Sequence, residues 1–400
     1  MQAAIIGGGA AGLMAAITAA ENGHSVTLFE RQARVGRKLL ATGNGRCNLS
    51  NTNLSTDNFH GVQADFVRPA LDAFPTEAAL DFFHNLGLLT VTEPSGRVYP
   101  LSDQAGSVVD VLRFAAEAAG VEMRTGEEVL SLSRSRNGFT LRLENGTFHA
   151  ERVVVCCGGM AGGKLGGTRS GYELLASLGH SRTALYPALV QLKTAPDFVR
   201  SLKGVRADAA VTLEKRGNVI AGSCGEVQFT DYGVSGPAIF EISRAAATGG
   251  EGLTVHLDLL RDYAQAEILA LLRQRCADFP ALTNENLLTG ILHNRLGRTV
   301  LRYAGCGLAE SVTALRERDI ANIARAIKDF ALPVSGTTGF DNAQVTAGGI
   351  STAEFDPETL CSRIVPGVYA AGEVLDVDGD CGGYNLQWAW ASGRKAGQLL

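Results

Sequence analysis

The sequence predicts an α/β protein in which a parallel-sheet domain is interrupted by a β-rich insert and a helical insert. Strand and helix patterns alternate up to about residue 186, and they return after about residue 341. Between these segments the pattern changes to alternating strands and then to helices. Strands that alternate with helices favour a parallel sheet. We therefore expect both ends of the chain to build one α/β domain around an insertion.

A glycine-rich turn near the N-terminus has the spacing G-x-G-x-x-G. Gly7, Gly9 and Gly12 follow an apolar run and open a helix of small residues, and a second apolar run, residues 25–29, ends at Glu30. In this pattern the first glycine allows the tight turn, the second lets backbone approach a pyrophosphate, and the third lets helix and strand pack closely. The terminal acid can accept hydrogen bonds from ribose hydroxyls. The order predicts a dinucleotide bound at a helix N-terminus.

Composition is typical of a globular protein, and we expect a cytoplasmic enzyme. The chain has 46% hydrophobic residues and a formal net charge of −5, so no overall basic field favours nucleic acid or anionic membrane. It has no apolar run long enough to cross a membrane. Its eight cysteines form no C-x-x-C pair, and its seven histidines show no zinc-binding spacing. We expect reduced thiols, no metal site and no membrane partner.

Domain boundaries follow from the changes of pattern. We predict that residues 1–186 and 341–400 form a dinucleotide-binding domain. Residues 187–260 and 329–340 form an inserted β-rich domain, and residues 261–328 an inserted helical domain. The final segment, from about residue 385, is predicted to be a helix, and Trp388 and Trp390 are expected to pack it.

The C-terminal segment favours FAD over NAD as the bound dinucleotide. An apolar strand there ends at Gly372 and Glu373, and Gly382 and Gly383 open the last helix. Free N–H groups at a helix N-terminus would stabilise the negative charge of a reduced flavin. The glycine cluster at 162–167 lacks a strand–helix–strand context, so no separate nicotinamide site is expected there. NADH or NADPH remains open as the electron donor.

The combination of motifs resembles one family along the whole chain. The motifs are Gly7–Gly12, Gly36–Asn48, Thr230–Pro237, Val345–Gly349 and Gly382–Trp390. They resemble those of the YhiN/BaiN-like flavoproteins, also catalogued as the aminoacetone-oxidase-type FAD-binding family. The resemblance implies an FAD-binding, Rossmann-like (two-dinucleotide-fold) domain interrupted by a β-barrel-like domain and a small helical domain.

The resemblance also implies which residues hold FAD. The expected contacts at the ADP half and along the pyrophosphate are Gly7, Gly9, Ala10, Ala11, Gly12, Glu30, Arg31, Arg37, Lys38 and Val129. Those expected towards the flavin are Thr42, Gly43, Asn44, Gly45, Gly372, Glu373, Asn385, Leu386 and Gln387. Cys157, Gly158 and Gly159 are also expected to contact the cofactor. One departure is visible, because Cys156-Cys157 stands where relatives commonly have Ala-Thr. The two following glycines are kept, so the backbone role should be kept too.

Three residues are hypothesised to carry the chemistry. Tyr384 is a candidate acid near flavin N5, with the aspartates of the same loop as alternatives, and Arg46 is a candidate anion anchor. Cys47 could face the flavin, or it could be a small residue that fills space in a tight loop. Disulfide-reductase chemistry is not expected, because Cys47 has no second cysteine near it.

Three functions remain open. The first is a reductase that delivers hydride from reduced flavin to an activated C=C bond of a small molecule. The second is a dihydrouridine synthase acting on a uridine of large-subunit ribosomal RNA, for which the arginines and lysines of residues 200–328 could form a phosphate-binding surface. The third is a small-amine oxidase of the aminoacetone type. The oligomeric state is left open.

Overall fold

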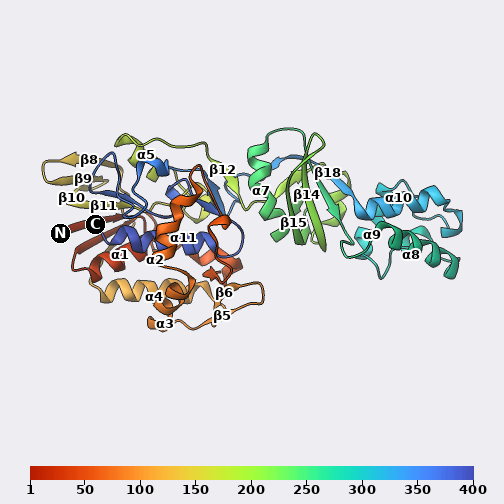
Figure 1. Cartoon of the computed structure of the whole chain (residues 1–400), viewed down its shortest axis with the longest axis horizontal. Coiled ribbons are helices and arrows are strands. Elements are labelled where there is room, and N and C mark those ends of the chain that lie inside the picture. The colour runs from red at the N-terminus through yellow and green to blue at the C-terminus, as the bar shows by residue number, and fades with distance from the viewer. The chain divides into compact units, whose positions relative to one another are not determined.

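The computed structural model describes the whole chain, Met1–Leu400, which folds as two compact units (Figure 1). The first unit contains Met1–Tyr186 and Ala343–Leu400, and the second contains Pro187–Asn342. The two ends of the chain therefore belong to the same unit, and the second unit is an insertion. Each unit is described by itself below.

The first unit is built on a five-stranded parallel sheet in the order β20-β11-β1-β2-β7. Its strands are β1 (Gln2–Ile6), β2 (Ser25–Glu30), β7 (Glu122–Thr125), β11 (Arg152–Val155) and β20 (Val368–Ala370). Ile5 pairs with Leu28 on one side and Val154 on the other, and all three are fully buried. Burial on both faces explains why the central strands are continuous apolar runs. The predicted Rossmann-like class is confirmed.

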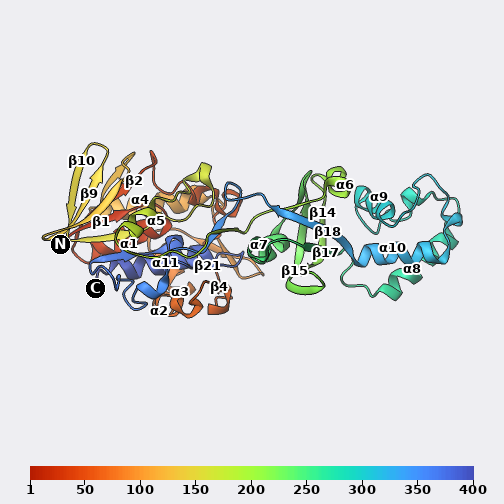
Figure 2. The same ribbon diagram turned by 90° about the horizontal axis from the view of Figure 1, so that it is seen from above.

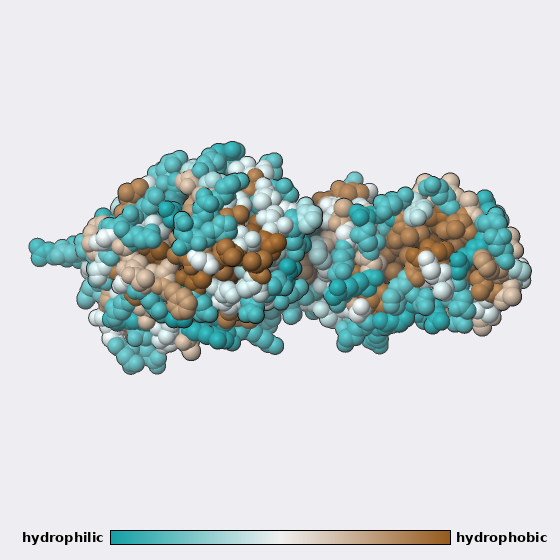
Figure 3. Space-filling model, turned by 90° about the horizontal axis from the view of Figure 1, so that it is seen from below, coloured by the Kyte–Doolittle hydropathy of each residue, from teal (hydrophilic) through white to brown (hydrophobic).

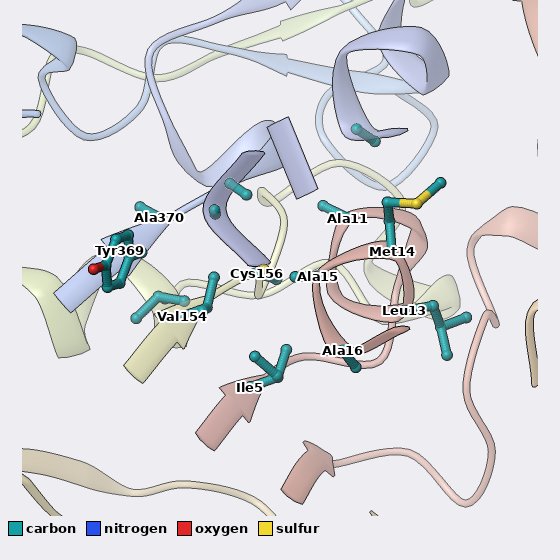
Figure 4. Packing of buried hydrophobic residues seen from close by; sticks show 14 of the residues in the cluster. Ile5, Ala11, Leu13, Met14, Ala15, Ala16, Val154, Cys156, Tyr369 and Ala370 are labelled. Atoms are coloured by element: carbon teal, nitrogen blue, oxygen red, sulfur yellow. The ribbon is translucent and has the colours of Figure 1, made fainter. Parts of the chain in front are cut away.

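Small residues let α1 (Ala10–Glu21) and α11 (Tyr384–Gly397) pack closely. A Cβ placed on Gly397 would stand 2.5 Å from the Ala15 carbonyl oxygen, and one on Gly393 would overlap that of Ala11. In Figure 4 Ala15 and Ala16 lie on the side of α1 that faces Ile5 and Val154 of the sheet, whereas Leu13 and Met14 point away from them. The alanine-rich sequence of α1 is thus required because sheet and helix crowd it.

Further elements surround this core in the first unit. Its other helices are α2 (Arg68–Ala73), α3 (Thr76–Asn85), α4 (Ala105–Ala118) and α5 (Ser170–Ser177). The smaller sheets are formed by β3 (Ser50–Asn51), β4 (Phe59–His60), β5 (Thr90–Thr92), β6 (Arg97–Pro100), β8 (Ser131–Ser135), β9 (Gly138–Leu143), β10 (Gly146–Ala150) and β21 (Asp378–Gly379). Trp388 and Trp390 are buried, and the Trp390 indole donates to the Leu49 carbonyl at 2.9 Å. Both tryptophans pack the last helix, as predicted.

The second unit contains a closed six-stranded barrel, which confirms the predicted β-barrel-like insert (Figure 2). Its strands are β13 (Leu192–Thr194), β14 (Arg206–Lys215), β15 (Asn218–Phe229), β16 (Gly233–Ser235), β17 (Leu253–Asp258) and β18 (Phe330–Thr337). Buried Ala209, Val211 and Leu213 alternate along β14, as expected for a strand with one face inside a barrel. The helices of this unit are α6 (Pro196–Val199), α7 (Pro237–Gly249), α8 (Gln265–Asp278), α9 (Asn294–Tyr303) and α10 (Glu317–Lys328).

The surface of the molecule mixes hydrophilic and hydrophobic residues, as the face in Figure 3 shows. No helix combines the length and the apolar character that a bilayer crossing requires.

Among the inserted helices, α10 has Ile320, Ile323 and Ile327 on one buried face. This spacing explains why α10 packs with one side and exposes its arginines on the other.

Candidate cofactor and active site

An open cavity lies at the carboxyl ends of β1 and β2. Five of the predicted cofactor residues line it, because the ends of parallel strands converge on one edge of the sheet. The residues that line it include Gly7, Glu30, Arg31, Val129, Cys157, Gly166, Thr168 and Ser170. Gly166, Thr168 and Ser170 were not predicted, and the glycine cluster at 162–167 therefore borders this cavity instead of forming a site of its own.

Glu30 is held rigidly at the end of β2 by backbone donors. The amide of Gly8 donates to its Oε2 at 2.8 Å, and the amide of Gln32 donates to its Oε1 at 2.7 Å. A carboxylate has about four acceptor sites, so both oxygens can still accept from ribose hydroxyls. The geometry fits the role predicted for this acid in binding the adenosine part of FAD.

The three fingerprint glycines meet different surroundings. Gly7 has a φ of +106°, and a Cβ there would lie 2.5 Å from the Cys156 carbonyl oxygen. A Cβ on Gly12 would overlap the Gly7 carbonyl oxygen, whereas one on Gly9 would meet nothing within 4 Å. Gly7 and Gly12 are thus required by the fold itself, and Gly9 leaves open space before the first turn of α1. That space and the unpaired amides of a helix start suit a pyrophosphate.

Lys38 and Glu373, which are far apart in sequence, form an ion pair in the first unit. The Lys38 Nζ lies 2.6 Å from Glu373 Oε2, and the Thr346 amide donates to Glu373 Oε1 at 3.0 Å. The Thr346 hydroxyl in turn accepts from the Ala161 amide at 3.0 Å. Thr346 lies in the motif Val345–Gly349, but the sequence alone did not indicate a role for it. Gly159 packs against both Thr346 and Glu373, so the two motif segments meet there.

Cys157 lines the cavity as a neutral thiol. Its Sγ donates to the Ile6 carbonyl at 3.6 Å, and burial raises its pKa to about 12. The adjacent Gly158 has a φ of +70°, and a Cβ there would meet nothing within 4 Å. Gly158 thus adopts a left-handed conformation directly after the buried thiol.

The loop before Asn48 has an unusual run of left-handed residues. Positive φ angles occur at Gly43 (+57°), Asn44 (+57°), Gly45 (+88°) and Cys47 (+63°). The Cys47 amide donates to the Thr42 carbonyl at 2.9 Å and closes the turn. The Cys47 side chain is fully buried, and burial raises its pKa to about 12. These observations favour the space-filling interpretation of Cys47 over a nucleophilic one.

We expect Cys47 to resist alkylation in the folded protein. A raised pKa keeps the thiol protonated below that value, so the reactive thiolate should not accumulate between about pH 7 and pH 9. Iodoacetamide should label exposed Cys224 first, and peptide mass spectrometry would measure both sites. Labelling of native Cys47 as fast as Cys224 would contradict this burial.

The predicted basic residues are engaged within the protein. Arg46 forms ion pairs with Glu93, at 3.2 Å, and with Asp103, and its guanidinium lies 3.9 Å from the centre of the Tyr99 ring. Its positive charge is therefore shared by two carboxylates. Arg37 donates to the Gln32 side chain, and Arg31 donates to the Gly166 carbonyl at 2.9 Å beside the cavity.

Side chains at the start of α11 hold the helix in place. Asn385 binds the backbone of Gly379 through its Oδ1 (2.8 Å) and its Nδ2 (2.7 Å). Buried Gln387 accepts from the Ser50 hydroxyl at 2.8 Å and donates to the Phe74 carbonyl at 2.7 Å. We therefore assign both side chains a structural role, which leaves the amides of Asn385 and Leu386 as the groups that can face a ligand. Tyr384 is mostly buried.

The turn that precedes α11 is equally constrained. Gly383 has a φ of +105°, and a Cβ there would overlap the Ser50 carbonyl. The Tyr384 ring packs edge-on against Phe59, with 6.3 Å between centroids. Among the alternative acids, Asp380 lies 2.7 Å from His60 Nε2, and Asp376 accepts from the Val62 amide at 3.1 Å. These contacts fit loop-forming roles for the aspartates.

Comparison with known proteins identifies relatives along the full length. The sequence profile described as "HI0933-like protein Rossmann domain" matches residues 1–399. A Clostridium scindens protein named 3-dehydro-bile acid delta(4,6)-reductase is 41% identical over 399 residues, which are 98% of this chain and 97% of that protein. An Escherichia coli protein named ribosomal RNA dihydrouridine synthase is 32% identical over 402 residues, covering 100% of this chain and 97% of that protein.

Proposed function

We propose that this chain, which belongs to the HI0933-like Rossmann-domain family, is an FAD-dependent reductase that delivers hydride to an activated C=C bond of a small molecule. The family resemblance drawn from the motifs is confirmed by the profile match and by the relatives. The observation that carries the proposal is the 41% identity to a protein named as a delta(4,6)-reductase, across almost all of both chains.

The first unit has the groups that FAD would need. Glu30 would bind the ribose, the first turn of α1 would face the pyrophosphate, and the start of α11 would face the flavin. When bound, FAD supplies the hydride for the reaction. The chain's own contribution is to hold the substrate, exclude water and offer a proton, for which Tyr384 remains our candidate. NADH or NADPH is our proposal for the reductant.

The chemistry requires a C=C bond that is conjugated to a carbonyl. A new C–H bond forms at the β carbon as the C=C π bond breaks. Its electron pair forms a π bond between the α carbon and the carbonyl carbon, and the C=O π pair moves to the oxygen. A proton then adds at the α carbon and restores the carbonyl. A site for this reaction must therefore stabilise negative charge on one oxygen and supply one proton.

The proposal can be tested by reoxidation of the reduced protein. We expect the anaerobically reduced, FAD-loaded protein to be reoxidised by cyclic enones and to yield the saturated ketone, measured by flavin absorbance and mass spectrometry. Aminoacetone with the oxidised protein is the comparison, because an amine oxidase would be bleached by it. Bleaching by aminoacetone together with inertness to every enone would reject the reductase.

A ribosomal uridine is our second candidate substrate, favoured by the 32% identity to the Escherichia coli protein. Uracil also has a C=C bond conjugated to a carbonyl, so the same chemistry applies. The basic residues of the insert give weaker support, since Lys203 pairs with Asp231 at 2.9 Å and Arg298 with Glu285 at 3.7 Å. In a separate experiment, deletion of the gene should remove a dihydrouridine from large-subunit rRNA if this candidate is right. An unchanged base would reject it.

A further inference from the structure

Arg97 is a cation without a carboxylate partner at the start of α11. Its Nη2 lies 4.0 Å from Cys381 Sγ, and it takes part in no ion pair, although it is partly buried. Arg46, in the same part of the first unit, is paired with two carboxylates. Burying part of a guanidinium without an anion costs free energy, so an unpaired arginine at such a place indicates a ligand that supplies the negative charge.

Three neighbouring segments fix the position of Arg97. Strand β6 places it directly opposite Asn51 of β3, and cross-strand partners project from the same face. The Asn51 amide donates to the Gly382 carbonyl at 2.9 Å. A Cβ on Gly382 would stand 3.6 Å from Arg97 Nε. The guanidinium is thus held beside the Gly382–Gly383 turn that opens α11, the turn assigned above to the flavin end.

We propose that Arg97 binds the carbonyl oxygen of an α,β-unsaturated substrate and stabilises the negative charge that this oxygen gains on reduction. The proposal rests on the reductase function above and names the residue that would recognise its substrate class. Hydride addition would form the C–H bond at the β carbon, the C=C electron pair would become the π bond between the α carbon and the carbonyl carbon, and the C=O π pair would become a lone pair of the enolate oxygen. The proton at the α carbon comes from another acid, because arginine stays protonated.

Geometry distinguishes Arg97 from Arg46 in this role. Arg46 would have to give up Glu93 and Asp103 before it could bind a new oxygen, and its charge is already balanced. Arg97 would have to give up only its contact with the Cys381 thiol, at 4.0 Å, to bind a substrate oxygen. A preorganised donor whose charge is not cancelled stabilises a developing oxyanion at little reorganisation cost.

The test uses phenolate binding to the oxidised, FAD-loaded protein. A phenolate mimics an enolate oxygen, and its binding can be titrated through changes in flavin absorbance without turnover. We expect Arg97→Gln to weaken phenolate binding by roughly 10- to 100-fold, with Arg97→Lys in between, because a charge-assisted hydrogen bond is lost. Arg113→Gln is the matched control, since Arg113 is on α4 and pairs with Asp110 and Glu117. FAD content should be equal in all variants.

Each outcome decides the proposal. Equal phenolate affinity in the wild type and Arg97→Gln would overturn it. If Arg97→Gln does not retain FAD, Arg97→Lys decides, and an unchanged phenolate affinity and an unchanged kcat for enones would overturn it. A wild type that is reoxidised by enones but binds no phenolate would also overturn it. Arg97-dependent phenolate binding in a protein that reduces no enone would support the anion site and reject only the reductase.

Discussion

Gly12→Ala is expected to destabilise the first unit by about 3 kcal/mol and to abolish FAD retention. The new Cβ would overlap the Gly7 carbonyl oxygen, so α1 would have to move away from the turn that follows β1. That movement also disturbs the contact of α1 with α11, where Gly393 and Gly397 leave no spare room. Urea unfolding followed by circular dichroism, together with the flavin content of the purified protein, would measure the effect.

Gly9→Ala is the matched control, because a Cβ there meets nothing within 4 Å. We expect its unfolding free energy to stay within about 0.5 kcal/mol of the wild type. Its FAD affinity should nevertheless fall by about tenfold or more, since the methyl group occupies the space that the pyrophosphate needs. Equal losses of stability in the two variants would show that the two glycines do not have the separate roles assigned here.

Glu30→Ala is expected to weaken FAD binding by roughly 100-fold. The alanine removes the acceptor for the ribose hydroxyls and also releases the amides of Gly8 and Gln32, which position the turn. Flavin fluorescence after serial dilution and dialysis would give the dissociation constant.

Glu144→Ala is the control for Glu30, because it removes the same charge from an exposed turn between β9 and β10. Its FAD affinity should equal that of the wild type. A Glu30→Ala protein that keeps its flavin through dialysis as well as the wild type does would refute the assignment of Glu30 to the ribose.

Local order in the chain made the strand–turn–helix–strand segment at the N-terminus predictable. The strand, the glycine turn, the helix and Glu30 follow one another within about thirty residues. The cavity borders Gly7, Glu30 and Val129, which the motifs assign to a cofactor site. The inserted barrel was also predictable, because alternating burial along β14 leaves a period of two in the sequence.

Which polar side chains are free to bind a ligand could not be predicted from local sequence order. Gln387 and Asn385 have amide side chains that could bind a ligand, yet both form hydrogen bonds within the protein that fix the start of α11. Arg46 and Arg97 are the same residue type in the sequence. Only the folded structure shows that Glu93 and Asp103 pair with Arg46. Partners of this kind come from distant segments and leave no local pattern.

By itself, the sequence determined the class of the fold, the family and the end of the first unit where a dinucleotide would be anchored. These properties depend on backbone conformation and on the periodicity of burial, and both are determined by residues that are close together in the sequence. The tertiary structure alone decided that Lys38 meets Glu373, that Cys47 is a buried neutral thiol and that Arg97 keeps its charge unpaired. Charge balance, burial and hydrogen bonding depend on which residues surround a group in space, and the fold brings those residues from distant parts of the chain.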